Sequence, residues 1–273
     1  MKRAIWLLVA ATLVLTACGT EEGAGGRQST ADPDSPLLQV RSEGGFAPVE
    51  YMLGRGPTYT LLAGGSLIHT GPEVAVFPGS LVPNYLVTEI DDDQMDTVLA
   101  LIDEIGLPEI DGEVVDDTQT AFVADATTEV ATYWDPEGGE HSYGVYALGL
   151  EPSDNPVNQA MSELLVVLDE FASQGDSMAY EGTRVRVVAG VGFDNPDYDD
   201  VRDWPLDNTD FSDWLTYPNG WMCDTFGAEV LTDFTDATTV TQWLHPDQMM
   251  DAPTFTLTVR PLHPGEPDCH PPT

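Results

Sequence analysis

The amino-acid sequence predicts an α+β fold: a mostly antiparallel sheet with two main helices, followed by a smaller, disulfide-stapled, β-rich C-terminal part. Short β-prone stretches flank glycine-rich turns, which is typical of hairpins. Two segments place apolar residues at helical spacing between capping residues. With 273 residues, 42% of them hydrophobic, the chain can form one large domain or two small ones with proper cores.

Two glycine-rich turns indicate hairpins in the first part of the body, which we expect to begin at Leu37. The first turn is Gly64-Gly65-Ser66, and the second lies within Asp135–Glu140. β-Prone residues flank both turns. The expected strands cover residues 37–41, 59–62, 67–69, 85–90, 128–134 and 141–148.

Two amphipathic helices are expected on one face of this sheet. The first follows Asp91-Asp92-Asp93, because short acids cap a helix and suit its positive end, and it ends at Gly106. A cation site is a second interpretation of this acidic triplet. The other helix begins at Asn155-Pro156 and ends at Gly175. Their apolar faces comprise Met95, Val98, Leu99, Ile102 and Ile105, and then Val157, Met161, Leu164, Leu168 and Phe171.

The C-terminal part has a different composition, and we expect it to form a β-rich domain or subdomain over residues 176–273. A Pro- and Asp-rich loop is expected over 194–213. Residues 227–234 suit a short helix, although their β-branched content also allows a strand. Clear strand patterns cover residues 183–191 and 254–260.

The N-terminus has the features of an export signal over residues 1–17. Lys2 and Arg3 precede an uncharged run over residues 4–17. That run is short for a helix that must cross roughly 30 Å of hydrocarbon, although an uncleaved anchor is the alternative. A Gly- and acid-rich stretch over 18–36 then predicts a flexible tether before the α+β domain of residues 37–175.

The end of the signal, Leu15-Thr16-Ala17-Cys18, resembles the lipobox of bacterial lipoproteins. The resemblance implies that the Cys18 thiol receives a diacylglyceryl group and that Cys18 becomes the new N-terminus. Acyl chains would hold the protein on the extracytoplasmic face of the cell membrane, since each buried methylene contributes about 0.8 kcal/mol. A secretory signal with a chance cysteine is the alternative.

Cys223 and Cys269 are the cysteines that remain after Cys18. In an oxidising exterior an isolated pair of this kind usually forms a disulfide. The competing interpretation is a metal site that adds His263 and His270. Zinc sites usually show two close ligand pairs, and only Cys269 and His270 are adjacent here, so the disulfide is the prediction.

The charge is strongly acidic: 47 Asp and Glu against 9 Lys and Arg give a formal net charge of −38. Loss of Lys2 and Arg3 with the signal would leave 7 − 47 = −40 and no lysine. Such a surface repels nucleic acid and anionic lipid, so we expect a cationic or neutral ligand. Our hypothesis is that the body is adapted to a saline exterior, and drift in a GC-rich genome is the alternative.

The catalytic motifs that a sequence can reveal are missing. There is neither a G-x-G-x-x-G nor a G-x-S-x-G pattern, and the mature chain has no lysine for a P-loop or a Schiff base. His69, His141 and His245 are scattered, and abundant acids make any one carboxylate a weak signal. We therefore expect a non-enzymatic binding or envelope-associated module without a cofactor. A cell-surface hydrolase is the alternative.

Two clusters allow a binding interpretation beside a structural one. Residues 194–200 alternate possible calcium ligands, but the sixth and twelfth positions from Asn195 hold Asp200 and Leu206, so no EF-hand loop is formed. We expect a solvated acidic loop there, with a non-standard calcium loop as the alternative. Aromatic residues crowd the C-terminal part, where we expect core packing and keep a sugar or peptide surface as the alternative. They are Tyr198, Trp204, Phe211, Trp214, Tyr217, Trp221 and Trp243.

The mature chain also resembles secreted lipoproteins of actinobacterial type that have no assigned activity. The resemblance therefore implies architecture and location and no particular reaction. The residues that carry it are Trp204-Pro205-Leu206, Cys223, Trp243 and the run from Arg260 to Cys269, with Gly44-Gly45-Phe46 and Tyr146-Ala147-Leu148 in the N-terminal part.

Overall fold

The folded body is an α+β structure with two mostly antiparallel sheets, which confirms the predicted fold class. Residues 31–273 form one compact unit. The expected division of the chain after residues 17, 36 and 175 stays a prediction. The structure is a computed structural model that describes residues 32–116, 125–150, 152–192, 200–207, 210–244 and 254–269.

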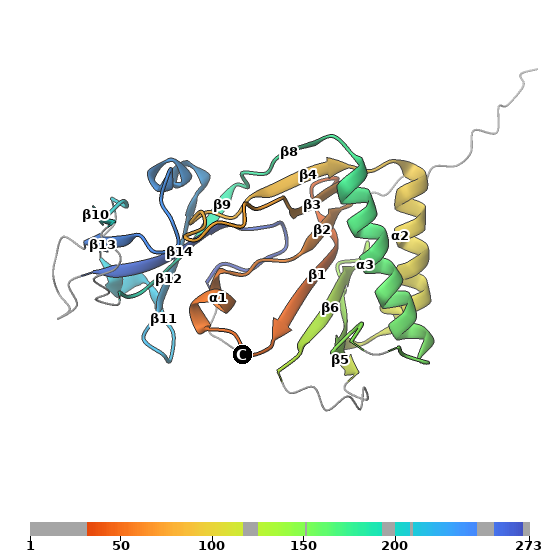
Figure 1. The fold of residues 1–273 in the computed structure, drawn as a ribbon. Helices are drawn as coiled ribbons and strands as arrows, with labels where there is room; N and C mark the ends of the chain where they lie inside the picture. The colour runs from red at the N-terminus through yellow and green to blue at the C-terminus, as the bar shows by residue number, and fades with distance from the viewer. Residues whose placement is uncertain are drawn as a thin grey trace, which may run out of the picture. The chain divides into compact units, whose positions relative to one another are not determined.

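The first sheet has eight strands in the order β5-β7-β6-β1-β2-β3-β4-β8, and only the pair β5–β7 is parallel (Figure 1). The two expected hairpins are β2–β3 and β6–β7. The strands are β1 (Pro36–Gly44), β2 (Tyr59–Leu62), β3 (Ser66–Thr70), β4 (Tyr85–Glu89), β5 (Gly112–Asp116), β6 (Thr127–Trp134), β7 (Glu140–Tyr146) and β8 (Ser177–Ala179).

Helices α2 (Asp92–Ile105) and α3 (Pro156–Gln174) lie side by side on one face of this sheet (Figure 1). Asp91 and Gln94 form a capping box, with each side chain accepting a bond from the other residue's backbone N–H. As the sequence predicts, Asn155 caps α3, because its side-chain oxygen accepts a bond from the backbone N–H of Val157. None of the helices in the described ranges is long and apolar enough to cross a membrane.

The second sheet has six strands in the order β10-β13-β14-β9-β12-β11. Its central strands β9 and β14 pair antiparallel over their whole lengths, and Val187 and Val259 lie opposite one another in its core. The strands are β9 (Arg184–Val191), β10 (Val201–Asp203), β11 (Leu215–Thr216), β12 (Met222–Gly227), β13 (Gln242–Leu244) and β14 (Phe255–Pro261).

Several short elements differ from the sequence-based expectations. The stretch expected as a loop over 194–213 contains β10 and the 3-10 turn Phe211–Asp213. Residues 228–234 form a 3-10 helix, so the expected short helix is correct there and the strand alternative is wrong. Pairing with β13 stabilises β10, and this is a tertiary effect that local patterns do not reveal. The elements without a sequence prediction are α1 (Val49–Gly54), the turn Leu107–Glu109, β5, β8, β11, β12 and β13.

The segment after β14 leaves the second sheet and packs on the first. Arg260 is 2% exposed and donates to both carboxylate oxygens of Glu266, at 2.6 and 2.7 Å. The backbone N–H of His263 also donates to Glu266, at 2.9 Å. Burial alone would raise the pKa of Glu266, but the bonds from Arg260 lower it below its usual value. This buried pair therefore folds residues 260–266 into a closed turn.

His263 connects this turn to the first sheet. Its side chain is fully buried, and its Nδ1 lies 2.9 Å from the Thr60 hydroxyl on β2. The rings of Tyr85 and Tyr180 approach it edge-on, with centroids at 4.6 and 5.4 Å. Burial lowers the pKa of His263 to about 4, so the ring is neutral near pH 7.

Further arginines and the disulfide hold the rest of the tail. Arg186 donates to the backbone carbonyl of Pro267 at 2.8 Å, and Arg184 forms an ion pair with Asp268. Cys223 on β12 bonds to Cys269, as the sequence predicts. The C-terminal segment is thus attached to both sheets along its length.

Removal of the disulfide should weaken the fold substantially. Cys223→Ala/Cys269→Ala should lower the free energy of unfolding by about 4 kcal/mol, because the bond joins residues 46 positions apart and restricts the unfolded chain. Urea unfolding with and without reductant measures this. Reductant should destabilise the wild type and leave the variant unchanged. A loss smaller than about 1 kcal/mol would contradict the expectation.

Acid should destabilise the protein through His263. The folded-state pKa lies below the ordinary value of 6.5, so protonation favours the unfolded chain. The contribution of His263 to the free energy of unfolding is complete above pH 6.5. As the pH falls towards 4, this contribution decreases by up to about 3 kcal/mol. Urea unfolding of His263→Asn between pH 7 and 4.5 should therefore show a shallower pH dependence than the wild type. His141→Gln is the matched control and should keep the steep acid loss.

Candidate functional site

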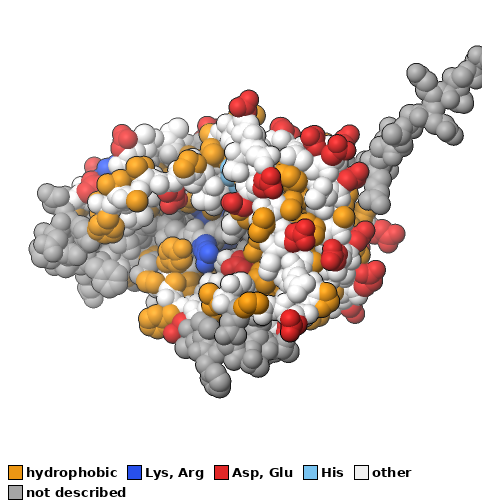
Figure 2. Space-filling model, turned by 45° about the vertical axis from the view of Figure 1, so that its right-hand side comes forward, with side chains coloured by type: hydrophobic (Ala, Val, Ile, Leu, Met, Phe, Trp, Pro, Cys, Tyr) orange, Lys and Arg blue, Asp and Glu red, His pale blue; other side chains and the backbone are white. Residues whose placement is uncertain are grey.

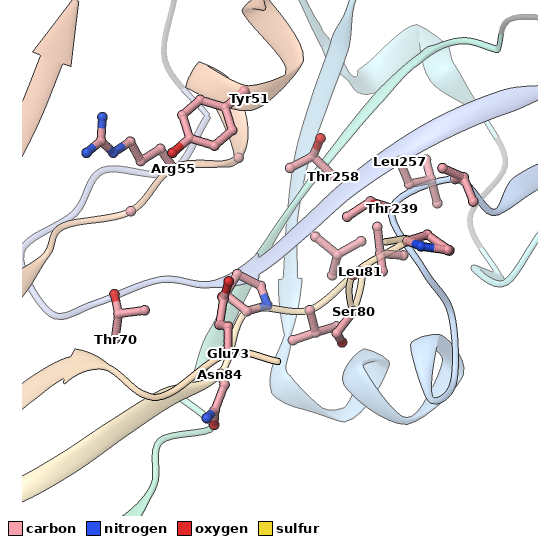
Figure 3. A pocket seen from close by; sticks show the side chains of 18 of the residues that line it. Tyr51, Arg55, Thr70, Glu73, Ser80, Leu81, Asn84, Thr239, Leu257 and Thr258 are labelled. Carbon is pink, nitrogen blue, oxygen red and sulfur yellow. The ribbon is translucent and has the colours of Figure 1, made fainter. Parts of the chain in front are cut away.

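A cleft of about 1140 Å³ is the best candidate for a functional site. Its lining comes from α1 with the residues that follow it, from the connection between β3 and β4, from Trp221, from the residues at and before β13, and from β14 (Figure 3). In Figure 2, acidic side chains are scattered among hydrophobic and other side chains, and basic ones are sparse. The cleft lies within the compact unit and combines residues far apart in the sequence.

Two glycines allow the α1 wall to lie directly on its neighbours. A Cβ at Gly54 would overlap the Thr258 side chain on β14. A Cβ at Gly56 would overlap the Tyr85 hydroxyl and lie 3.0 Å from the Arg260 guanidinium. The close approach places Tyr51 and Arg55 on this wall.

The opposite wall is an exposed apolar connection. It leaves β3 at Thr70, and its far end reaches the connection that precedes β13, where the Leu81 N–H donates to the Ala237 carbonyl at 3.0 Å. Between these ends Val74 is 83% exposed and Val76 is 62% exposed. Large apolar side chains with this exposure are unusual for a solvated loop and often mark a binding surface.

The remaining lining combines apolar and uncharged polar side chains. Trp221 packs flat on Gly190, where any Cβ would overlap its ring, and one side of Trp221 borders the cleft. Threonines also line the cleft, and within the described ranges their hydroxyls make no hydrogen bond. These threonines are Thr58, Thr70, Thr239, Thr256 and Thr258. Their hydroxyls can each donate to and accept from a ligand.

Arg55 differs from the other arginines in the part of the chain that the structure describes. Each of the others bonds a carboxylate or a backbone carbonyl. The guanidinium of Arg55 has only a distant ring contact, 5.9 Å above the centre of Tyr51. Glu73 lines the opposite wall and likewise has no hydrogen-bond or ion-pair partner among the described residues (Figure 3). The cleft therefore carries one unpaired charge of each sign.

The described histidines lie outside this lining and are committed to structural bonds. His69 is buried, with Nδ1 3.2 Å from the Thr70 carbonyl and Nε2 3.0 Å from the Thr88 hydroxyl. His141 contacts the Ile110 carbonyl at 2.6 Å and Asp135 at 3.1 Å. The Ile110 carbonyl and Asp135 raise the pKa of His141. His245 lies outside the described residues.

The candidate metal ligands take other roles where the structure describes them. Asp91 of the acidic triplet caps α2, and Cys269 is occupied by the disulfide. Residues 194–199 of the possible calcium loop lie outside the described residues. The last residue of that loop, Asp200, forms an ion pair with Arg202. His270 is not described either. In the described ranges, no group of three or more His, Cys, Asp or Glu residues could hold a metal ion.

The aromatic cluster divides between core and cleft. Trp214 and Trp243 are buried in the second core, and Trp204 and Phe211 pack against it. Tyr198 lies outside the described residues. Trp221 is the member that borders the cleft, so the core interpretation accounts for most of the cluster.

The sequence did not single out Arg55 or Glu73. Both are surface charges on short irregular segments, and no local pattern connects them to β14. Cys18, the expected lipidation site, lies outside the described residues, and its lipidation stays a prediction.

Comparisons with protein-family models, with curated proteins and with solved structures found no match to this chain. The chemistry of the cleft therefore has to be inferred from its own residues.

Proposed function

We propose that this protein is a lipid-anchored extracytoplasmic binding module whose ligand occupies the cleft between α1, the β3–β4 connection and β14. The observation that carries the proposal is the cleft itself. It has apolar walls, unbonded hydroxyls and one unpaired charge of each sign. Ligand sites generally combine an apolar lining with a few polar groups that orient the ligand.

The anchor in this proposal rests on the sequence. The lipobox-like Leu15-Thr16-Ala17-Cys18 supplies the acylation site, and the tether over residues 18–36 separates it from the body. Two or more acyl chains hold a soluble domain stably at a membrane, whereas one chain does so only marginally. The acidic body would be repelled by anionic headgroups, so it would stand away from the bilayer.

Binding is favoured over the alternative of a cell-surface hydrolase by the composition of the cleft. A serine hydrolase needs a histidine beside its nucleophile and a carboxylate that orients the histidine. The described histidines bond to backbone carbonyls, threonines or Asp135, and none lines the cleft. The cleft is thus equipped to hold a ligand by shape, hydroxyls and two charges.

Loss of the acylated cysteine should release the protein from the membrane. Cys18→Ser in the full chain should move most of the product from the membrane fraction to the soluble extracytoplasmic fraction, because no acyl chain is attached. Fractionation and intact-mass spectrometry measure this. Cys223→Ala/Cys269→Ala is the control and should stay in the membrane fraction. An unacylated wild type would refute the anchor.

A neutral apolar probe should bind in the cleft. N-phenyl-1-naphthylamine should bind with a stoichiometry of one per chain and gain fluorescence, because the walls exclude water. Thr239→Trp fills part of the cleft and should weaken binding by about tenfold. Thr232→Trp is the matched control, because Thr232 is exposed outside the lining. Equal affinity in both variants would remove the cleft from the proposal.

A further inference from the structure

From the two unpaired charges we infer that the cleft takes a zwitterionic ligand with an apolar body, of the kind represented by a short apolar peptide with free ends. The carboxylate would bind Arg55, and the ammonium group would bind Glu73. This inference rests on the proposed binding function and specifies the ligand class.

Arg55 has the chemistry to receive a carboxylate. A guanidinium presents a planar fork that matches two carboxylate oxygens, and such bonds are stronger than neutral ones. The sequence has 47 acidic residues, yet none of those in the described ranges forms an ion pair with Arg55. The fork is exposed at the outer edge of the cleft, where it extends away from Thr258 (Figure 3), and Tyr51 is its one contact among the described side chains.

Glu73 supplies the complementary group on the facing wall. Glu73 is exposed and precedes the apolar residues Val74 and Val76. The side-chain amide of the neighbouring Asn84 donates to the Pro72 carbonyl at 3.1 Å, so Asn84 is held in place (Figure 3). An ammonium group that entered between the walls would meet this carboxylate without competition from another described cation. The separation of the two charges on opposite walls sets the direction of the ligand.

The net charge of the protein selects among the remaining ligand classes. A net charge of −38 disfavours the approach of an anionic amphiphile such as a fatty acid. If the carboxylate of a fatty acid bound Arg55, Glu73 would face the apolar end of the fatty acid. A cationic amphiphile would place its charge near Glu73 but would leave Arg55 without a partner. A zwitterion has no net charge to be repelled and satisfies both residues.

The threonine hydroxyls favour a peptide over a purely hydrocarbon body. Thr58, Thr239, Thr256 and Thr258 line the cleft with hydroxyls that bond to none of the described residues. A peptide group offers one donor and one acceptor, and each hydroxyl can serve either. Apolar side chains of the ligand would then contact Val74, Val76 and the ring of Trp221.

The test uses displacement of N-phenyl-1-naphthylamine by the peptide Leu-Ala-Leu in four forms: free, N-acetylated, C-amidated and doubly blocked. Free Leu-Ala-Leu should displace the probe. Blocking either end should weaken the affinity of the peptide about tenfold, since a charge-assisted bond is lost. Free leucine in a parallel titration distinguishes an amino-acid site from a peptide site.

Variants assign each end of the ligand. Arg55→Gln should abolish the preference for the free carboxylate and keep the preference for the free amine, and Glu73→Gln should do the reverse. Arg41→Gln and Glu104→Gln are matched controls outside the lining and should behave like the wild type. The inference is overturned if blocked and free peptides compete equally, or if both variants weaken all forms alike. Probe binding without any competition by peptide would leave the binding module standing and remove only this ligand class.

Discussion

The buried ion pair between Arg260 and Glu266 is the interaction on which the two-sheet arrangement depends. Both charges are withdrawn from water, and a lone buried charge would be strongly unfavourable. Each charge compensates the other, and the Glu266 carboxylate also accepts a bond from the backbone N–H of His263. The pair closes the segment after β14 into a turn, and this turn places His263 against Thr60 on the first sheet.

The cleft follows from this constraint. Because the end of β14 is fixed against β2 and β4, the α1 segment has to pass over Arg260 and Tyr85, which is possible only where Gly56 lacks a side chain. The wall that carries Arg55 is then held close to β14. If the cleft is the proposed binding site, walls held in this way would leave it largely formed before a ligand arrives, which would lower the cost of ordering on binding.

The parts of the fold that the sequence predicted are those determined by local chemistry. Asp91 and Asn155 cap helices through bonds to residues two or three positions away, and the paired cysteines follow from their isolation in the sequence. The strand β12 was not predicted, because Asp224 and Thr225 interrupt its apolar pattern and its pairing with β9 is a long-range effect. The cleft could not be predicted either, since Arg55, Glu73 and Thr258 come together only through the topology of both sheets.

The exposed connection between β3 and β4 has a consequence for solubility. Val74 to Phe77 is a short, strongly β-prone run on the surface, and such runs can recruit copies of themselves into intermolecular sheets. Pro72 and Pro78 bracket it, and neither can donate the backbone hydrogen bond that a growing sheet requires. Together with mutual repulsion between highly anionic bodies, the two prolines allow the protein to keep an apolar wall of the cleft exposed while resisting self-association.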